Sequence, residues 1–139
     1  MTIVVLSPSG RETGEKLSKA LEMELHARSA PADRIFIETA EHLRDLFTIG
    51  SPILFVGAAG AVIRILAPLL ADKEAEPPVL AIAEDGSAIV PLLGGHHGAN
   101  DLARRAGNAL GIAPSITTAS DLSLGVALDN PPTGWHLAP

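Results

Sequence analysis

Apolar residues along the chain form two alternating patterns, short continuous runs and repeats at helical spacing. Short runs rich in β-branched residues predict buried strands, and they fall at 2–6, 34–38, 53–56, 79–83, 87–93 and 115–119. Apolar positions at three- and four-residue steps predict helices, over 12–27, 39–47, 61–70 and 100–110.

Glycine, proline and small polar residues mark the ends of these elements. Pro68 is expected to kink or shorten its helix, and Gly111 is a natural helix stop. Ser9, Thr39 and Asn100 are the expected N-caps. Residues 84–86 read Glu-Asp-Gly, a tight-turn signature that predicts a β-hairpin between the runs 79–83 and 87–93.

The alternation of strands and helices predicts an α/β fold. We expect a three-layer sandwich, with a mostly parallel sheet, one β-hairpin, and helices on both faces. Hydrophobic residues make up 47% of the 139 residues and aromatic ones only 3%, which suits strands buried on both faces. The predicted domain covers 1–121, and the Gly- and Pro-rich stretch 122–139 is predicted to be a tail or linker.

Composition narrows the classes of partner and compartment. A net charge of −6 disfavours nucleic acid and anionic membranes as partners. The chain has no cysteine, so disulfides and thiolate zinc sites are excluded. The start, MTIVVLSPSG, does not resemble a signal peptide, and no run is long enough to span a membrane. We therefore expect a cytoplasmic protein; the oligomeric state is left open.

Two glycine-rich loops each follow a predicted strand and open a predicted helix. Their glycines are Gly57 and Gly60 in the first loop, and Gly94, Gly95 and Gly98 in the second. In α/β folds, ligands bind at the carboxyl ends of strands, and the free N–H groups of a helix start favour anions. Neither loop is a complete nucleotide-binding fingerprint, and glycines that only permit tight turns are the alternative reading.

Candidate side chains cluster around the second loop. His96 and His97 are candidates for a base or a hydrogen-bond donor, and the alternative is that they are plain loop residues. His97 and Asp101 share a helix face if the helix starts early. No further ligands stand at useful spacing, so no metal site is expected. The other candidates for binding a ligand are Arg64, Asn100, Thr117 and Thr118.

Taken together, residues 55–121 resemble the N-terminal domain of the CbiG family of cobalamin-biosynthesis proteins. The resemblance rests on the order of several short motifs: GxxG, RxxAP, DKxxxPxV, the Asp-Gly hairpin, PLLxGH, ANxLA and ITTAxD. A single glycine after His97, where the family tends to have two, and the tail GVALDNPPTGW are similar to the version fused to the precorrin-3B methyltransferase CobJ.

The resemblance implies opening of the δ-lactone of cobalt-precorrin-5A with release of acetaldehyde. It makes His96 the candidate base, with Asp101 as the group that orients it. The implied partners are a tetrapyrrole intermediate and a methyltransferase of the pathway, in cis or in trans. No cofactor is expected for the domain itself, and S-adenosylmethionine only where a methyltransferase domain follows.

Two other functions remain open from the sequence. One is a non-catalytic domain that binds or presents a corrin intermediate for a partner methyltransferase. The other is a generic nucleotide-binding α/β domain, which the incomplete glycine fingerprints disfavour.

Overall fold

A six-stranded, mostly parallel sheet forms the centre of the protein. The computed structural model describes residues 1–118, and the sheet order is β3-β2-β1-β4-β5-β6. All neighbouring strands are parallel except β5 and β6, which are antiparallel. The strands are β1 (Thr2–Val5), β2 (Glu24–Ala27), β3 (Arg34–Ile35), β4 (Ile53–Val56), β5 (Val79–Ile82) and β6 (Ile89–Leu93).

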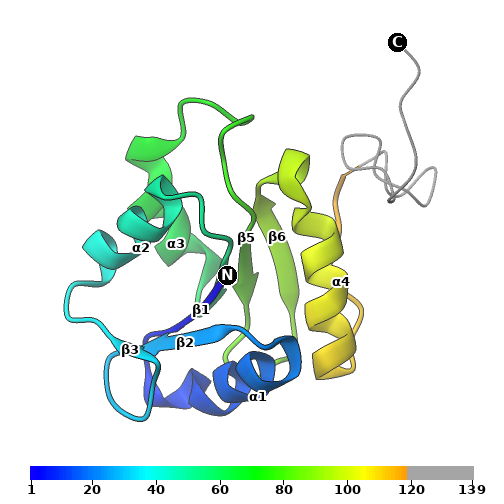
Figure 1. Cartoon of the computed structure of the whole chain (residues 1–139). Helices are drawn as coiled ribbons and strands as arrows, with labels where there is room; N and C mark the ends of the chain where they lie inside the picture. The colour runs from blue at the N-terminus through cyan, green and yellow to red at the C-terminus, as the bar shows by residue number, and fades with distance from the viewer. Residues whose placement is uncertain (119–139) are drawn as a thin grey trace.

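Two helices cover each face of this sheet, as Figure 1 shows. α1 (Arg11–Leu21) packs beside α4 (Ala99–Leu110) on one face, and α2 (Thr39–Thr48) packs beside α3 (Ala59–Leu66) on the other. Three short 3₁₀ turns complete the described chain, namely η1 (Pro8–Gly10), η2 (Ala67–Leu69) and η3 (Gly95–His97).

Each face of the sheet has its own apolar core. Successive residues of a strand point to opposite faces, so Ile3 packs under α1 and α4 while Val4 packs under α2 and α3. Phe55 is fully buried on the second face. Because the central strands are buried on both sides, they read as unbroken apolar runs, and this is why the run 53–56 predicts β4 to the residue.

The predicted fold class, hairpin and several element ends are confirmed. α3 stops at Leu66 and a 3₁₀ turn follows that contains Pro68, as expected for a residue without a backbone donor. Gly111 closes α4 in the left-handed conformation, with φ 73°, which glycine adopts without a steric penalty.

The predicted helix over 12–27 is wrong beyond Leu21. Glu22 takes a left-handed conformation with φ 55°, and the chain turns back into β2. Leu25 fits the helical repeat of the preceding residues, but it is also buried in a strand beside β1. A single apolar residue fits both periods, so the pairing with β1 decided the outcome.

The predicted N-caps are also wrong, and two predicted strands are shortened or absent. Gly10, Glu38 and Gly98 occupy the cap positions instead of Ser9, Thr39 and Asn100. The strand over 34–38 is reduced to Arg34–Ile35. Residues 115–118 form no strand, although Ser115 N–H donates to the carbonyl of Ile89 at 2.8 Å; Ala119 lies outside the described residues, as does the predicted tail.

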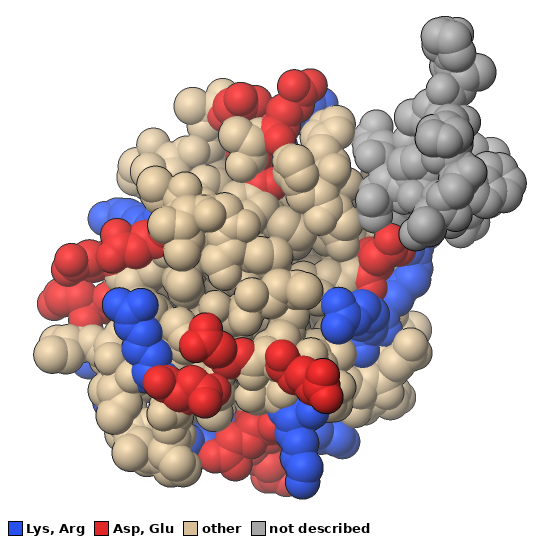
Figure 2. Space-filling view, viewed as in Figure 1, with Lys and Arg blue, Asp and Glu red and all other residues tan. Residues whose placement is uncertain are grey.

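On the face seen in Figure 2, charged side chains of both signs lie at the top, along the sides and over the lower half, and the middle of the face is largely uncharged. Among residues 1–118, no helix is both long and apolar enough to cross a bilayer. The same residues contain no group of three or more His, Cys, Asp or Glu side chains placed to hold a metal ion.

Candidate functional site

The loop between β6 and α4 turns sharply at two glycines. Gly94 and Gly98 both have positive φ, 84° and 90°, and η3 lies between them. His97 N–H donates to the carbonyl of Gly94 at 2.9 Å, and Leu102 N–H donates to that of Gly98 at 3.0 Å. These bonds link the end of β6 to the start of α4.

A pocket of about 250 Å³ opens beside this loop. Three segments that are distant in sequence form its wall: the connection before β5, the end of β6 with the glycine loop, and the stretch after α4. Its lining residues are Lys73, Glu76, Pro91, Leu92, Leu93, Gly94, Gly95, His96, Ala99, Asn100, Thr117 and Thr118.

The connection 72–78 and the glycine loop are tied to each other at two points. The His97 ring lies with Nε2 2.5 Å from the carbonyl oxygen of Glu74, to which it donates. A Cβ atom on Gly94 would lie 2.4 Å from Cα of Pro78, so the two backbones touch where only glycine fits. The two segments lie side by side at the top of Figure 1, and together they hold the pocket's shape.

Several predicted site residues meet in this pocket. His96 is half-buried, and Asn100 is buried with 8% of its surface exposed. Asn100 Nδ2 donates to Thr118 Oγ1 at a long 3.4 Å, which brings the stretch after α4 over the pocket. His97 and Gly98 frame the loop without lining the pocket.

Asp101 takes a different place from the one predicted. It is exposed on the first turn of α4, it does not line the pocket, and its Oδ1 accepts from Arg104 at 3.0 Å. This ion pair is three residues apart on a solvent-facing helix surface, where such pairs contribute little to stability. The expectation that Asp101 orients His96 is not supported by this placement.

The other glycine loop, which contains Gly57 and Gly60, lies at the opposite ends of the sheet's strands. β6 runs antiparallel to β5, with Leu93 opposite Val79, so the end of β6 lies at the amino ends of the parallel strands. Gly57 and Gly60 follow β4 at their carboxyl ends. The two loops, each predicted to bind a ligand at the carboxyl end of a strand, therefore lie at opposite ends of the parallel strands, because the hairpin reversed the last strand.

A separate cavity of about 610 Å³ lies at the carboxyl edge, lined in part by Gly57 and Glu84. The Glu84 carboxylate accepts from Ser7 Oγ at 2.6 Å and also from Ser9 Oγ. These hydroxyl donors lower the pKa of Glu84, so it carries a negative charge near the start of α3. Arg64 is exposed, with its guanidinium folded over Gly60. A fixed carboxylate makes this cavity a poor receptor for an anionic ligand.

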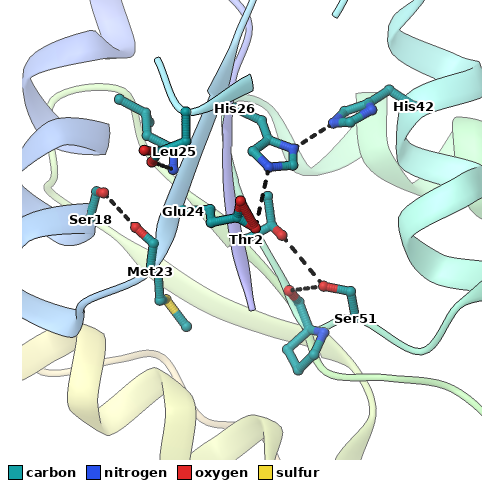
Figure 3. A network of polar contacts seen from close by, with 10 residues as sticks. Thr2, Ser18, Met23, Glu24, Leu25, His26, His42 and Ser51 are labelled. Carbon is teal, nitrogen blue, oxygen red and sulfur yellow. Dashed lines mark hydrogen bonds and ion pairs between the residues drawn. The ribbon is translucent and has the colours of Figure 1, made fainter. Parts of the chain in front are cut away.

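A buried histidine pair lies between β2 and α2, and no motif in the sequence indicated it. His26 Nδ1 and His42 Nε2 are 2.8 Å apart, and the His42 ring stacks on Phe36. Figure 3 shows the pair and the neighbouring Glu24. His26 Nε2 is buried without a hydrogen bond, since the Glu24 carboxylate is 3.9 Å away. Burial, the largest cause, lowers the pKa of both rings, and the mutual repulsion of the two rings lowers that of His42 further.

We expect mild acid to destabilise the protein through this pair. The folded pKa values lie below the ordinary 6.5, so below that pH the unfolded chain binds protons that the folded chain does not. The free energy of unfolding then falls by up to about 1.4 kcal/mol per pH unit for each histidine, and it levels off below the folded pKa values. Urea unfolding between pH 7.5 and 5.5 measures this slope. The double variant H26L/H42L should lose most of it, and an unchanged slope would contradict the assignment.

The fold and the pocket define the class of protein to which this chain belongs. This is a doubly wound α/β domain with a His96-containing pocket beside the glycine-rich loop between β6 and α4. The model of the family "Cobalamin synthesis G N-terminal" matches residues 41–121. The chain belongs to this family, as its resemblance to CbiG predicted.

Relatives with curated names agree with this assignment. The chain is 36% identical over 137 residues to the cobalt-precorrin-5A hydrolase of Salmonella typhimurium. This match covers 93% of the chain and 38% of the hydrolase. It is 39% identical over 88 residues to the enzyme of the same name from Priestia megaterium, covering 63% of this chain and 24% of that protein. The chain thus spans well under half the length of these relatives.

A solved structure shows the same fold. The crystal structure of a cobalamin biosynthesis protein G homologue from Sulfolobus solfataricus superposes with a TM-score of 0.64 at 25% sequence identity. The match covers 88% of this chain and 38% of the homologue.

Proposed function

We propose that this chain is a cobalamin-biosynthesis module that binds a tetrapyrrole intermediate and opens the δ-lactone of cobalt-precorrin-5A. The pocket beside the β6–α4 loop carries the proposal, since it combines a half-buried histidine, a buried amide and a glycine-rich helix start. The similarity to proteins named cobalt-precorrin-5A hydrolase supports the choice of substrate.

Lactone opening needs a base for the attacking water and donors for the oxyanion that forms on the carbonyl carbon. We assign the base role to His96, which lines the pocket. The 12-residue helix α4 begins at Ala99 on the pocket wall, and its first N–H groups favour negative charge there. Water adds to the carbonyl, the ring C–O bond breaks, and the products are a carboxylate and an alcohol.

The pocket's size decides how much of the substrate it holds. Its volume of about 250 Å³ is smaller than the roughly 300–1,000 Å³ typical of small-molecule sites, and a tetrapyrrole macrocycle is large. We infer that the pocket receives the lactone-bearing edge of the ring. Lys73 at the pocket wall is placed to meet an acetate or propionate group of that edge, and the rest of the macrocycle lies outside.

The predicted ligand contacts at Gly57, Gly60 and Arg64 lie at the other ends of the strands and are not part of this pocket.

The proposed protein partner follows from the family resemblance. A methyltransferase of the pathway, in cis or in trans, is the proposed protein partner, and S-adenosylmethionine belongs to that partner.

Turnover of cobalt-precorrin-5A by the purified chain tests the proposal. We expect an absorbance shift on binding, then a product of changed mass with release of acetaldehyde. A shift without turnover would favour a non-catalytic corrin-binding domain. Tight binding of a nucleotide with no response to the tetrapyrrole would contradict both.

A further inference from the structure

Glu76 is a buried carboxylate in the wall of the same pocket, and neither the motifs nor the comparisons assign it a role. Only 7% of its surface is exposed, whereas Glu74, two residues earlier, is exposed. Glu76 and His96 come from segments twenty residues apart in sequence and line one pocket. Burial of an acidic side chain is rare unless it is paired or has a function.

The Glu76 carboxylate has no hydrogen-bond partner among residues 1–118. In that same range, His26 Nε2 is the only fully enclosed side-chain polar atom that lacks one. The oxygens of Glu76 therefore keep some contact with solvent, and Glu76 is one of the residues that line the pocket. None of residues 1–118 donates to this carboxylate, so it is available to accept from a ligand hydroxyl in the pocket.

The backbone, and not the side chain, holds Glu76 in place. Ala75 N–H donates to the carbonyl of Asp72 at 3.2 Å, and Ile53 N–H donates to that of Pro78 at 2.9 Å. The His97 ring fixes the carbonyl of Glu74 from the other side. Two prolines follow Glu76 directly and restrict the backbone further. The backbone that carries the Glu76 side chain is thus fixed before any ligand arrives, which favours catalysis by a preorganised group.

We propose that Glu76 is a second catalytic residue, the base of the carbon–carbon cleavage that follows lactone opening; this rests on the proposed function above. Opening leaves a hydroxyl on the two-carbon fragment. Glu76 takes the hydroxyl proton, the C–O bond becomes C=O, and the bond to the ring breaks. Its electron pair enters the conjugated macrocycle, which recovers the proton from Glu76. The products are acetaldehyde and the protonated ring, and the carboxylate is regenerated.

Glu76 suits this step better than the other acid near the loop. Asp101 is exposed, engaged with Arg104 and outside the pocket lining. Two basic groups in one pocket, His96 for the water and Glu76 for the alcohol, match a reaction with two proton abstractions.

The variant E76Q separates the two steps. In the full chain with cobalt-precorrin-5A, we expect the opened hydroxy acid to accumulate, one water heavier than the substrate, while acetaldehyde release falls about 100-fold or more. E76D should recover part of that release because it keeps a carboxylate. E74Q is the matched control: its side chain is exposed in the same connection, and both steps should proceed at the wild-type rate.

The substrate-free variant provides an independent measurement. Since the carboxylate has no partner to lose, the melting temperature of E76Q should equal or exceed that of the wild type. A lower melting temperature would reveal a structural role and overturn the assignment, as would wild-type acetaldehyde release by E76Q or a block of lactone opening itself. A wild-type chain that leaves the lactone intact would instead overturn the proposed function, and the Glu76 role with it.

Discussion

Replacing His96 by alanine is expected to lower the rate of lactone opening about 100- to 10,000-fold, the range typical for loss of a general base. The substrate should still bind, because the backbone donors of the loop and Lys73 at the pocket wall are unchanged. Substrate should therefore remain as intact lactone in the variant. Single-turnover kinetics, with mass detection of the opened product, measures this effect without interference from product release.

The matched control for His96 is Asn108→Ala. Asn108 is exposed in the last turn of α4, about 14 Å along the helix from its start, so this variant should open the lactone at the wild-type rate. An unchanged rate in H96A would remove His96 as the base and leave it a ligand-holding residue at most. Partial recovery of H96A by added imidazole would support the base role directly.

Gly94→Ala is expected to cost about 2–5 kcal/mol of unfolding free energy. About 1–2 kcal/mol comes from placing a side chain in the left-handed region, where Gly94 has φ 84°. A further 1–3 kcal/mol or so comes from overpacking, because the new Cβ would lie 2.4 Å from the backbone of Pro78. Urea unfolding at neutral pH measures the change. The strain also pushes the connection 72–78 away from the loop, so the pocket should bind its ligand more weakly.

Gly95→Ala is the matched control for this effect. The neighbouring glycine has open space around its Cβ position and no positive φ. Its replacement should change the free energy of unfolding by no more than about 0.5 kcal/mol. If both variants were equally stable, the backbone contact between Gly94 and Pro78 would not be the cause.

Much of the fold was predictable because its central strands are buried on both faces. Runs such as 53–56 and 79–83 are apolar throughout, and two strong breakers, Pro68 and Gly111, fall where α3 and α4 end. Strands near the edge of the sheet were less predictable. β2 was assigned to a helix because Leu25 also fits the helical repeat, and its strand pairing is a long-range contact that local spacing does not reveal.

The candidate site was predictable in part. The glycine loop with His96 lines a pocket, together with Asn100, Thr117 and Thr118, all of them chosen from the sequence. Glu76 was overlooked because its connection reads as a polar surface segment, and the burial of one residue within it depends on what packs above it. The His26–His42 pair was overlooked for a similar reason, since two histidines sixteen residues apart meet only when β2 lies against α2.

By itself, the sequence determined the α/β class, the order of most elements, the family, and the loop around His96, because these follow from local periodicity, backbone-restricting residues and ordered motifs. Only the tertiary structure decided that the two glycine loops lie at opposite ends of the strands, that Asp101 faces solvent beside Arg104, and that Glu76 shares a pocket with His96. The physical reason is that the direction of the last strand and the packing of the connection against Gly94 set which groups meet, and both arise from contacts between distant segments.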